Sequence, residues 1–291
     1  MRSVQYLTLP LPELPRAHYV ARGYYTAAYF SVGPKDGRPL VLCHGLAANG
    51  LQFVDDAHFF ADLGFRVIVP DLRGHGRSKM PERKLRRKED FSIENMAGDL
   101  MAILDAERVE HVNWVGNSLG AVLAVKIMGD KPDMIGRLVC FGTSFPMEVS
   151  PVSFAIMLVL SRLVRRDHLN RIGAGISSKN PEARAIIYAM LKQADRQTIV
   201  RQARHLQNLD FIDTEIDFEG NMLLLQRAGG KNNDQALGPV LGIMDPNGQF
   251  FIRDIKDIGH FANLDQPQII RKIILDYVGS RTGRQPGSPE L

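Results

Sequence analysis

The residues with the clearest chemical potential lie in "HVNWVGNSLGAVLAVKIM", residues 111–128. Here Ser118 stands between Gly116 and Gly120 in the pattern G-x-S-x-G, after an apolar run and before a helical run of small and apolar residues. A reversal from strand to helix at one residue forces strained backbone angles on the serine, and side chains two positions before and after it would collide with backbone. The spacing therefore predicts a nucleophilic hydroxyl at a sharp turn.

A serine hydroxyl needs a base that takes its proton and an acid that orients the base. On an elbow of this kind the chain order is serine, acid, histidine. Three histidines follow Ser118, and two of them, His168 and His205, lie among arginines in a helical stretch. The third, His260, follows the last predicted strand in "DIGHFANLDQP", directly before the final predicted helix. We predict that His260 is the general base.

The acid is expected in the loop after the predicted strand "NMLLLQ", residues 221–226. That loop reads "RAGGKNNDQALGP", and Asp234 is its only carboxylate. Asp245 is the alternative, but it lies only fifteen residues before His260, which leaves little room for a helix and a strand. The segment "DPNG" at Asp245 is also typical of a plain turn. The sequence favours Asp234 and leaves Asp245 open.

A developing oxyanion needs two preorganised N–H donors. Leu119, at the start of the helix after the serine, is expected to supply one, with the helix dipole behind it. Leu46, in the loop "CHGLAANG" after the first predicted parallel strand, is expected to supply the other. His44 precedes the nucleophile in the chain, and we interpret it as a residue that fixes this loop.

These residues require a scaffold, and short apolar runs predict the buried strands of a parallel sheet at residues 39–45, 65–71, 111–118, 137–143, 221–226 and 249–255. Helical patterns alternate with them at residues 52–63, 92–107, 119–130 and 267–279. The alternation predicts an α/β fold, a mostly parallel twisted sheet with helices on both faces. Residues 17–34 predict an antiparallel hairpin at one sheet edge.

Residues 146–218 interrupt the alternation because their patterns are helical throughout. We expect an inserted helical cap over the carboxyl edge of the sheet, where ligands bind in open parallel sheets. The core would comprise residues 1–145 and 219–280, with a flexible tail at 281–291. Apolar side chains early in the cap are substrate-binding candidates, although they could equally pack on the core. They are Met147, Phe154, Met157 and Leu158.

The sequence resembles an α/β-hydrolase-fold protein with a helical cap over roughly residues 20–280. The resemblance rests on four motifs in the expected order: "HGLAAN", "PDLRGHGRS", "VGNSLG" and "GHFANLDQP". It implies that neither a metal nor an organic cofactor takes part. It also implies a catalytic triad and two oxyanion donors at Ser118, Asp234, His260, Leu46 and Leu119.

Members of this family with dehalogenase or epoxide-hydrolase chemistry carry aspartate at the elbow, so Ser118 argues against both activities. The run "DLRGHGRS" is similar to a structural turn of the family, and we interpret Asp71, Arg73 and His75 as loop architecture. Two features depart from the family pattern. The acid loop "GGKNND" is longer and more polar, and the elbow lacks the third glycine of many relatives.

The leading hypothesis is a serine hydrolase that cleaves a carboxylic ester or similar small acyl compound through an acyl-enzyme. One alternative is hydrolysis of a carbon–carbon bond in a diketo-acid-type compound, because Asn117 is similar to a residue of hydrolases that cleave ring-fission products. The other alternative is of another class: a ligand receptor or signalling protein with this fold and little turnover.

Charge and composition limit the partners and location we expect. The net charge of +4 over 291 residues is mild and local, which argues against nucleic acid. The basic stretches 79–90 and 162–168 are expected to be solvated loops, the alternative being attraction of an anionic substrate or lipid head group. The longest apolar stretch, 154–160, is too short for membrane insertion. No signal-peptide pattern is visible, and Cys43 and Cys140 lie in apolar runs, so a cytoplasmic location is expected.

Overall fold

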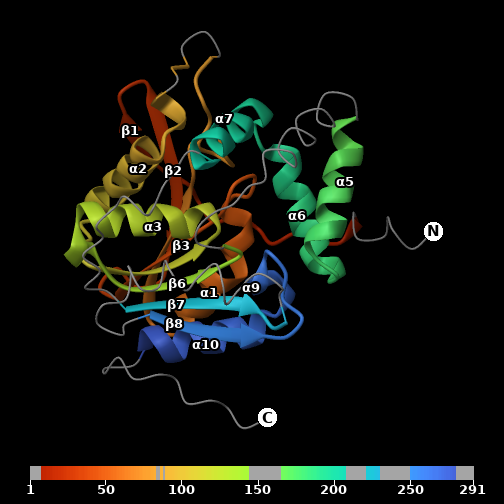
Figure 1. Ribbon diagram of the computed structural model, residues 1–291. Coiled ribbons are helices and arrows are strands. Elements are labelled where there is room, and N and C mark those ends of the chain that lie inside the picture. Colours follow the sequence, from red (N-terminus) through yellow and green to blue (C-terminus); the bar gives the residue numbers. More distant parts are fainter. Residues whose placement is uncertain are drawn as a thin grey trace.

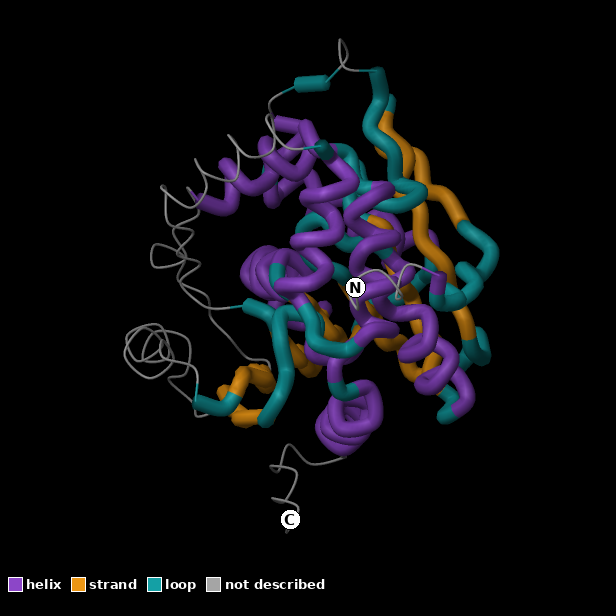
Figure 2. The backbone as a smooth tube through the Cα atoms, turned by 90° about the vertical axis from the view of Figure 1, so that its right-hand side faces the viewer, coloured by secondary structure: helices purple, strands orange, loops and turns teal. Residues whose placement is uncertain are grey.

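The computed structural model describes residues 8–82, 86–87, 89–143, 165–207, 221–229 and 250–279. Within these residues, eight strands form one sheet in the order β1-β2-β4-β3-β5-β6-β7-β8. Their bounds are β1 His18–Arg22, β2 Tyr25–Val32, β3 Arg38–Cys43, β4 Phe65–Asp71, β5 Val112–Asn117, β6 Ile135–Phe141, β7 Asn221–Arg227 and β8 Phe250–Ile255. The β1–β2 and β2–β4 pairs are antiparallel, and every other neighbouring pair is parallel. The strand direction changes from one edge to the other, as expected for a twisted sheet (Figure 2).

Both faces of the sheet are covered by helices (Figure 1). Helices α2 (Ile93–Ala106) and α3 (Leu119–Asp130) bury their apolar residues with Trp114 on one face. Helices α1 (Val54–Asp62) and α10 (Pro267–Gly279) bury theirs with Val115 on the other. Because successive strand residues point to opposite faces, both faces of the central strands must be apolar. This is why the strands appear in the sequence as continuous hydrophobic runs.

The predicted fold class is confirmed. The hairpin expected within 17–34 is present as β1 and β2 at one edge of the sheet. Ser92 caps α2 by accepting a hydrogen bond from the Asn95 backbone N–H at 3.2 Å. The sequence did not predict the single-turn helix α9 (Ala262–Asp265) before α10. One turn is too short to show a helical repeat of apolar residues.

Three helices lie between β6 and β7 in the chain: α5 (Arg166–Ser177), α6 (Pro181–Gln193) and α7 (Arg196–Gln207). Helices α5 and α6 lie on the side of the molecule toward which the arrowheads of β7 and β8 point (Figure 1). Residues 144–164 and 208–220 are outside the described residues, so the boundaries of the cap stay a prediction. Among the helices described, none has the length and apolar character needed to cross a bilayer.

Candidate active site

Ser118 occupies the turn between β5, which ends at Asn117, and α3, which begins at Leu119. Its backbone angles are φ 49° and ψ −113°, a conformation that side-chain-bearing residues rarely adopt. The Ser118 N–H donates to the Phe141 carbonyl at 2.9 Å, and the Ser118 carbonyl accepts from Ala121 N at 2.9 Å. The surrounding structure thus holds one strained residue in place, a feature concentrated at active sites.

The two glycines around Ser118 permit this turn. A Cβ on Gly116 would lie 2.5 Å from the backbone nitrogen of Ala121. A Cβ on Gly120 would lie 2.2 Å from the carbonyl oxygen of Cys43. Both distances are too short for real atoms and involve rigid backbone, so any side chain would force the elbow apart. The collision predicted from the sequence is present in the structure.

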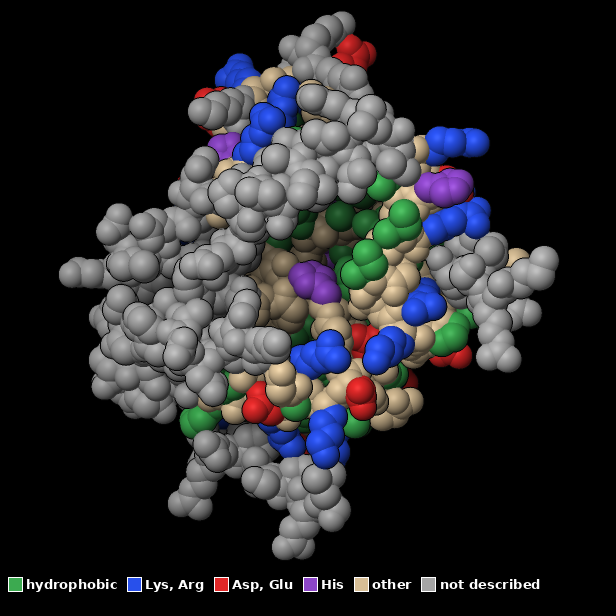
Figure 3. Space-filling model, turned by 45° about the vertical axis from the view of Figure 1, so that its right-hand side comes forward, with side chains coloured by type: hydrophobic (Ala, Val, Ile, Leu, Met, Phe, Trp, Pro, Cys, Tyr) green, Lys and Arg blue, Asp and Glu red, His purple; other side chains and the backbone are tan. Residues whose placement is uncertain are grey.

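His260 lies in the turn between β8 and α9, and its neighbour Phe261 stacks edge-on with a ring-centroid distance of 5.1 Å. The side chain is exposed to solvent, yet the surrounding protein displaces part of its hydration and lowers the pKa of the imidazole. Within the described residues its ring nitrogens make no hydrogen bond. The face of the molecule drawn in Figure 3 contains a hollow, in which a histidine is exposed beside hydrophobic side chains.

Asn117 joins the elbow to the turn that carries His260. Its side chain is fully buried, and its Nδ2 donates to the His260 carbonyl at 2.8 Å and to the Phe141 carbonyl at 3.2 Å. Gly142 completes the junction, since a Cβ there would lie 2.2 Å from the His260 carbonyl oxygen and 2.4 Å from Asn117 Nδ2. The residue directly before Ser118 is therefore bonded to the backbone of His260, across 143 positions of sequence.

Of the two expected oxyanion donors, one lies at the elbow and the other in a neighbouring loop. Leu119 begins α3 and is fully buried, and Leu46 lies in the loop after β3. In the described part of the chain, neither backbone N–H donates a hydrogen bond. Gly45 keeps the two loops in contact, because a Cβ there would lie 3.0 Å from Ser118 Cβ. Unused N–H groups beside a strained serine are what stabilisation of an oxyanion requires.

Two buried histidines hold the Leu46 loop in place. His44 Nδ1 donates to the Gly45 carbonyl at 2.8 Å, and its Nε2 accepts from Leu72 N at 2.9 Å. The Nε2 atom of His75 accepts from Ala47 N at 3.0 Å. Both rings are almost free of solvent contact, and burial lowers the pKa of His44 to about 4 and that of His75 to about 3. Both are therefore neutral near pH 7, which leaves each Nε2 free to accept.

The loop after β4 is built by the residues expected there. Asp71 accepts from Gly50 N at 2.7 Å and from Arg77 N at 2.9 Å. Arg73 donates twice to the Asp99 carboxylate, at 2.7 Å each. With the His75 contact to Ala47, these bonds account for the "DLRGHG" run as loop architecture.

Several predicted site residues lie outside the described residues. They are Asp234, its alternative Asp245, and the substrate-binding candidates Met147, Phe154, Met157 and Leu158. Their roles stay predictions. The described residues also contain no cluster of three or more histidine, cysteine, aspartate or glutamate side chains suited to a metal ion.

A profile of the alpha/beta hydrolase fold matches residues 38–200, which is more than half of the chain. The chain belongs to the α/β hydrolase fold family. The solved enol-lactonase from Burkholderia xenovorans LB400 has the same fold, with a TM-score of 0.75 and 18% identity over 90% of this chain and 100% of that one. At that identity the likeness shows the fold alone.

Curated relatives match a smaller part of the chain. A haloalkane dehalogenase of Mycolicibacterium paratuberculosis is 32% identical over 111 residues, 38% of this chain and 36% of that protein. A magnesium-chelatase 30 kDa subunit of Rhodobacter capsulatus is 36% identical over 102 residues, 34% of this chain and 33% of that protein. The matched region thus spans only about a third of the length of these two relatives.

The hydrogen bond from Asn117 to the His260 carbonyl spans 143 positions and has no local signal in the sequence. Substituting Asn117 with alanine should remove both donated hydrogen bonds and let the His260 turn shift away from Ser118. We expect kcat for ester hydrolysis to fall by roughly tenfold to a hundredfold, because misplacement of a catalytic group by about 1 Å costs about that much. Steady-state kinetics measure the effect. Asn113→Ala on the same strand is the matched control, and equal losses in both variants would contradict the anchoring role.

The buried histidines predict acid lability. Unfolding frees His44 and His75 to titrate at about pH 6.5, while in the folded protein their pKa values are about 4 and about 3. The unfolded chain therefore binds more protons below pH 6.5, so stability falls as the pH falls through this window. From pH 7 to pH 5 each histidine should remove about 2 kcal/mol of the free energy of unfolding. Urea titrations at pH 7 and at pH 5 measure this change in the free energy of unfolding. Between pH 7 and pH 5, His75→Gln should lose less of its free energy of unfolding than the wild-type protein does. An equal loss in the two proteins would contradict the proposed contribution of His75 to acid lability.

Proposed function

We propose that this protein is a serine hydrolase that cleaves a carboxylic ester or a similar small acyl compound. The backbone of Ser118 carries the proposal: a side-chain-bearing residue held at φ 49° and ψ −113° where a strand turns into a helix. Holding a residue in such a conformation costs on the order of 1–3 kcal/mol. A turn that only connected β5 to α3 would be formed more easily by glycine, so the retained hydroxyl indicates a chemical role.

In the proposed mechanism, Ser118 Oγ attacks the substrate carbonyl while the imidazole of His260 takes its proton. The N–H groups of Leu46 and Leu119 bind the oxygen on which negative charge develops. His260 then returns the proton to the leaving alcohol, which leaves an acyl group on Ser118. Water, activated by the same imidazole, releases the acid. Asp234 is proposed to hold the imidazole in its working orientation.

The pH dependence of the reaction follows from the environment of His260. Only the neutral imidazole can take a proton, and desolvation lowers its pKa. We therefore propose that kcat/KM rises with pH and reaches half its plateau below the ordinary histidine pKa of about 6.5.

The structure weakens the motivation for carbon–carbon hydrolysis. The Asn117 amide is fully buried and donates to two backbone carbonyls. These two bonds give the Asn117 amide nitrogen a structural role that involves no contact to substrate. The dehalogenase relative does not change the proposed chemistry either, because its alignment covers 38% of this chain and Ser118 stands where dehalogenase chemistry uses aspartate.

The test is labelling of the full chain with a fluorophosphonate, followed by mass-spectrometric mapping of the modified residue. We expect a single adduct on Ser118 and turnover of short p-nitrophenyl esters. The substrate panel adds a lactone, which is a cyclic ester, and a ring-fission diketo acid monitored by loss of its chromophore. Turnover of the diketo acid alone would favour carbon–carbon hydrolysis. A folded protein that neither labels nor turns over any compound would favour a receptor or signalling protein.

A further inference from the structure

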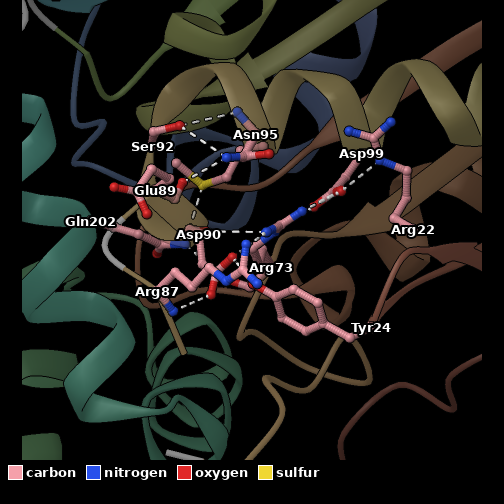
Figure 4. Close-up of polar contacts among 11 residues, drawn as sticks. Arg22, Tyr24, Arg73, Arg87, Glu89, Asp90, Ser92, Asn95, Asp99 and Gln202 are labelled. Carbon is pink, nitrogen blue, oxygen red and sulfur yellow. Dashed lines mark hydrogen bonds and ion pairs between the residues drawn. The ribbon is translucent and has the colours of Figure 1, made fainter. Parts of the chain in front are cut away.

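Helix α7 rests on the loop after β4 through two fully buried polar side chains, Thr198 and Gln202. Gln202 Nε2 donates to the Arg73 carbonyl at 2.9 Å, and Figure 4 shows this side chain reaching from α7 to Arg73. Thr198 packs on Gly74 so closely that a Cβ there would lie 2.4 Å from Thr198 Cγ2. The helix and the loop therefore meet with no space between them.

The Arg73 carbonyl accepts a second hydrogen bond, from His75 Nδ1 at 3.0 Å. Because the proton of the neutral ring is then on Nδ1, Nε2 is the acceptor, and it receives the Ala47 N–H at 3.0 Å. Gln202 and Ala47 are thus connected through one carbonyl and one imidazole. Arg73 itself is fixed by its paired bonds to Asp99, so its carbonyl has a defined position.

The end of this chain of bonds is the loop that carries the proposed oxyanion donor. Ala47 follows Leu46 directly and has a φ of 64°, in the left-handed region that alanine seldom occupies. A residue held there depends on its surroundings. The bond to His75 holds the Ala47 N–H and with it this strained backbone conformation. If the bond is lost, the backbone at Ala47 can relax, and Leu46 beside it, with its N–H, is no longer held in one position.

We propose that Gln202 is a positioning residue that couples the seating of α7 to the alignment of the Leu46 oxyanion donor. This inference rests on the proposed hydrolase function and extends it. The oxyanion loop has its reactive geometry when α7 is seated on the Arg73 loop. Substrate contacts that shift α7 therefore change the rate of the chemical step as well as binding.

Gln202→Met tests the coupling. Methionine keeps the length of the side chain but cannot donate to the Arg73 carbonyl. We expect it to fold, because Gln202 Oε1 is buried and accepts no hydrogen bond within the described residues, so the substitution also removes an unpaired buried oxygen. Thermal unfolding checks this point. Arg201→Met is the matched control on the same helix. The guanidinium carbon of Arg201 lies 4.9 Å from the centroid of the Phe91 ring, and within the described residues Arg201 makes no hydrogen bond to the Arg73 loop.

The first measurement is amide hydrogen exchange of the peptide that contains residues 44–50, which does not depend on activity. Gln202→Met should raise the exchange rate of this peptide by up to about tenfold, which corresponds to the net free energy of one hydrogen bond. Arg201→Met should leave the exchange rate unchanged. The second measurement is the kinetics of ester hydrolysis and fluorophosphonate labelling. Gln202→Met should lower kcat and the labelling rate roughly tenfold with little change in KM, less than the loss of a whole oxyanion donor.

The two proposals fail in different ways. Unchanged exchange at residues 44–50 in Gln202→Met would overturn the coupling, whatever the activity. Equal exchange and equal rate losses in both variants would also overturn it, because they would indicate general loosening of α7. Raised exchange in Gln202→Met alone would support the coupling even if the wild-type protein failed to label, and that failure would count against the hydrolase function.

Discussion

Ser118→Ala should abolish ester turnover and fluorophosphonate labelling while leaving the thermal unfolding temperature nearly unchanged. The substitution removes the attacking oxygen, and loss of a triad nucleophile costs about 10⁴-fold or more in kcat. It keeps a Cβ, so the strained backbone angles of the elbow stay as they are. The hydrogen bonds of the Ser118 backbone to Phe141 and Ala121 also remain, since they involve only main-chain atoms.

Ser92→Ala is the matched control for this variant. Ser92 caps α2 through its side-chain oxygen. It precedes α2 in the chain and is not part of the elbow. Its removal should cost about 1 kcal/mol of stability and leave the rate of turnover unchanged. Ester hydrolysis and thermal unfolding are measured on both variants. Turnover retained by Ser118→Ala would mean that the nucleophile is another residue.

Asp234→Asn should lower kcat by about 10⁴-fold, with Asp245→Asn close to the wild-type rate. An asparagine in place of the triad acid keeps the shape but favours the wrong tautomer of the histidine and cannot stabilise its charged form, which is the source of so large a loss. Each variant is the control of the other, because both replace a carboxylate by an amide in the same stretch of chain. Single-turnover labelling alongside ester kinetics separates chemistry from substrate binding.

The pair of variants also gives a clear contrary result. If Asp245→Asn loses activity and Asp234→Asn does not, the acid is Asp245, and the spacing argument that gave preference to Asp234 is wrong. If neither loses activity, neither carboxylate orients His260. The pH profile of each variant is a second, independent measurement. Loss of the true triad acid should lower the pKa at which His260 acts as a base.

Much of the fold could be predicted from the sequence because its signals are local. Strand β4 was predicted with the bounds that the structure has, since its buried run is continuous and ends at Asp71. The cap of α2 at Ser92 also depends on residues a few positions apart. The short helix α9 was missed because a single turn gives no repeat.

Parts of the candidate site were predictable for the same reason. The elbow needs glycines two residues either side of Ser118, and this steric requirement is written in five consecutive positions. The position of His260 after the last strand followed from the topology of a parallel sheet, whose strands all end at one edge. Asp234 had no comparable local signal, which is why a second carboxylate stayed open.

The sequence by itself determined the strained serine, the alternation of strands and most helices along the chain, and the histidine after the last strand, because each depends on neighbouring residues or on the order of elements along the chain. Only the tertiary structure decided what holds them together. The bond from Asn117 to His260 joins residues 143 positions apart, and that from Gln202 to Arg73 joins residues 129 apart. Such pairings depend on how loops from different strands approach one another in the folded chain, and no pattern along a single segment records that approach.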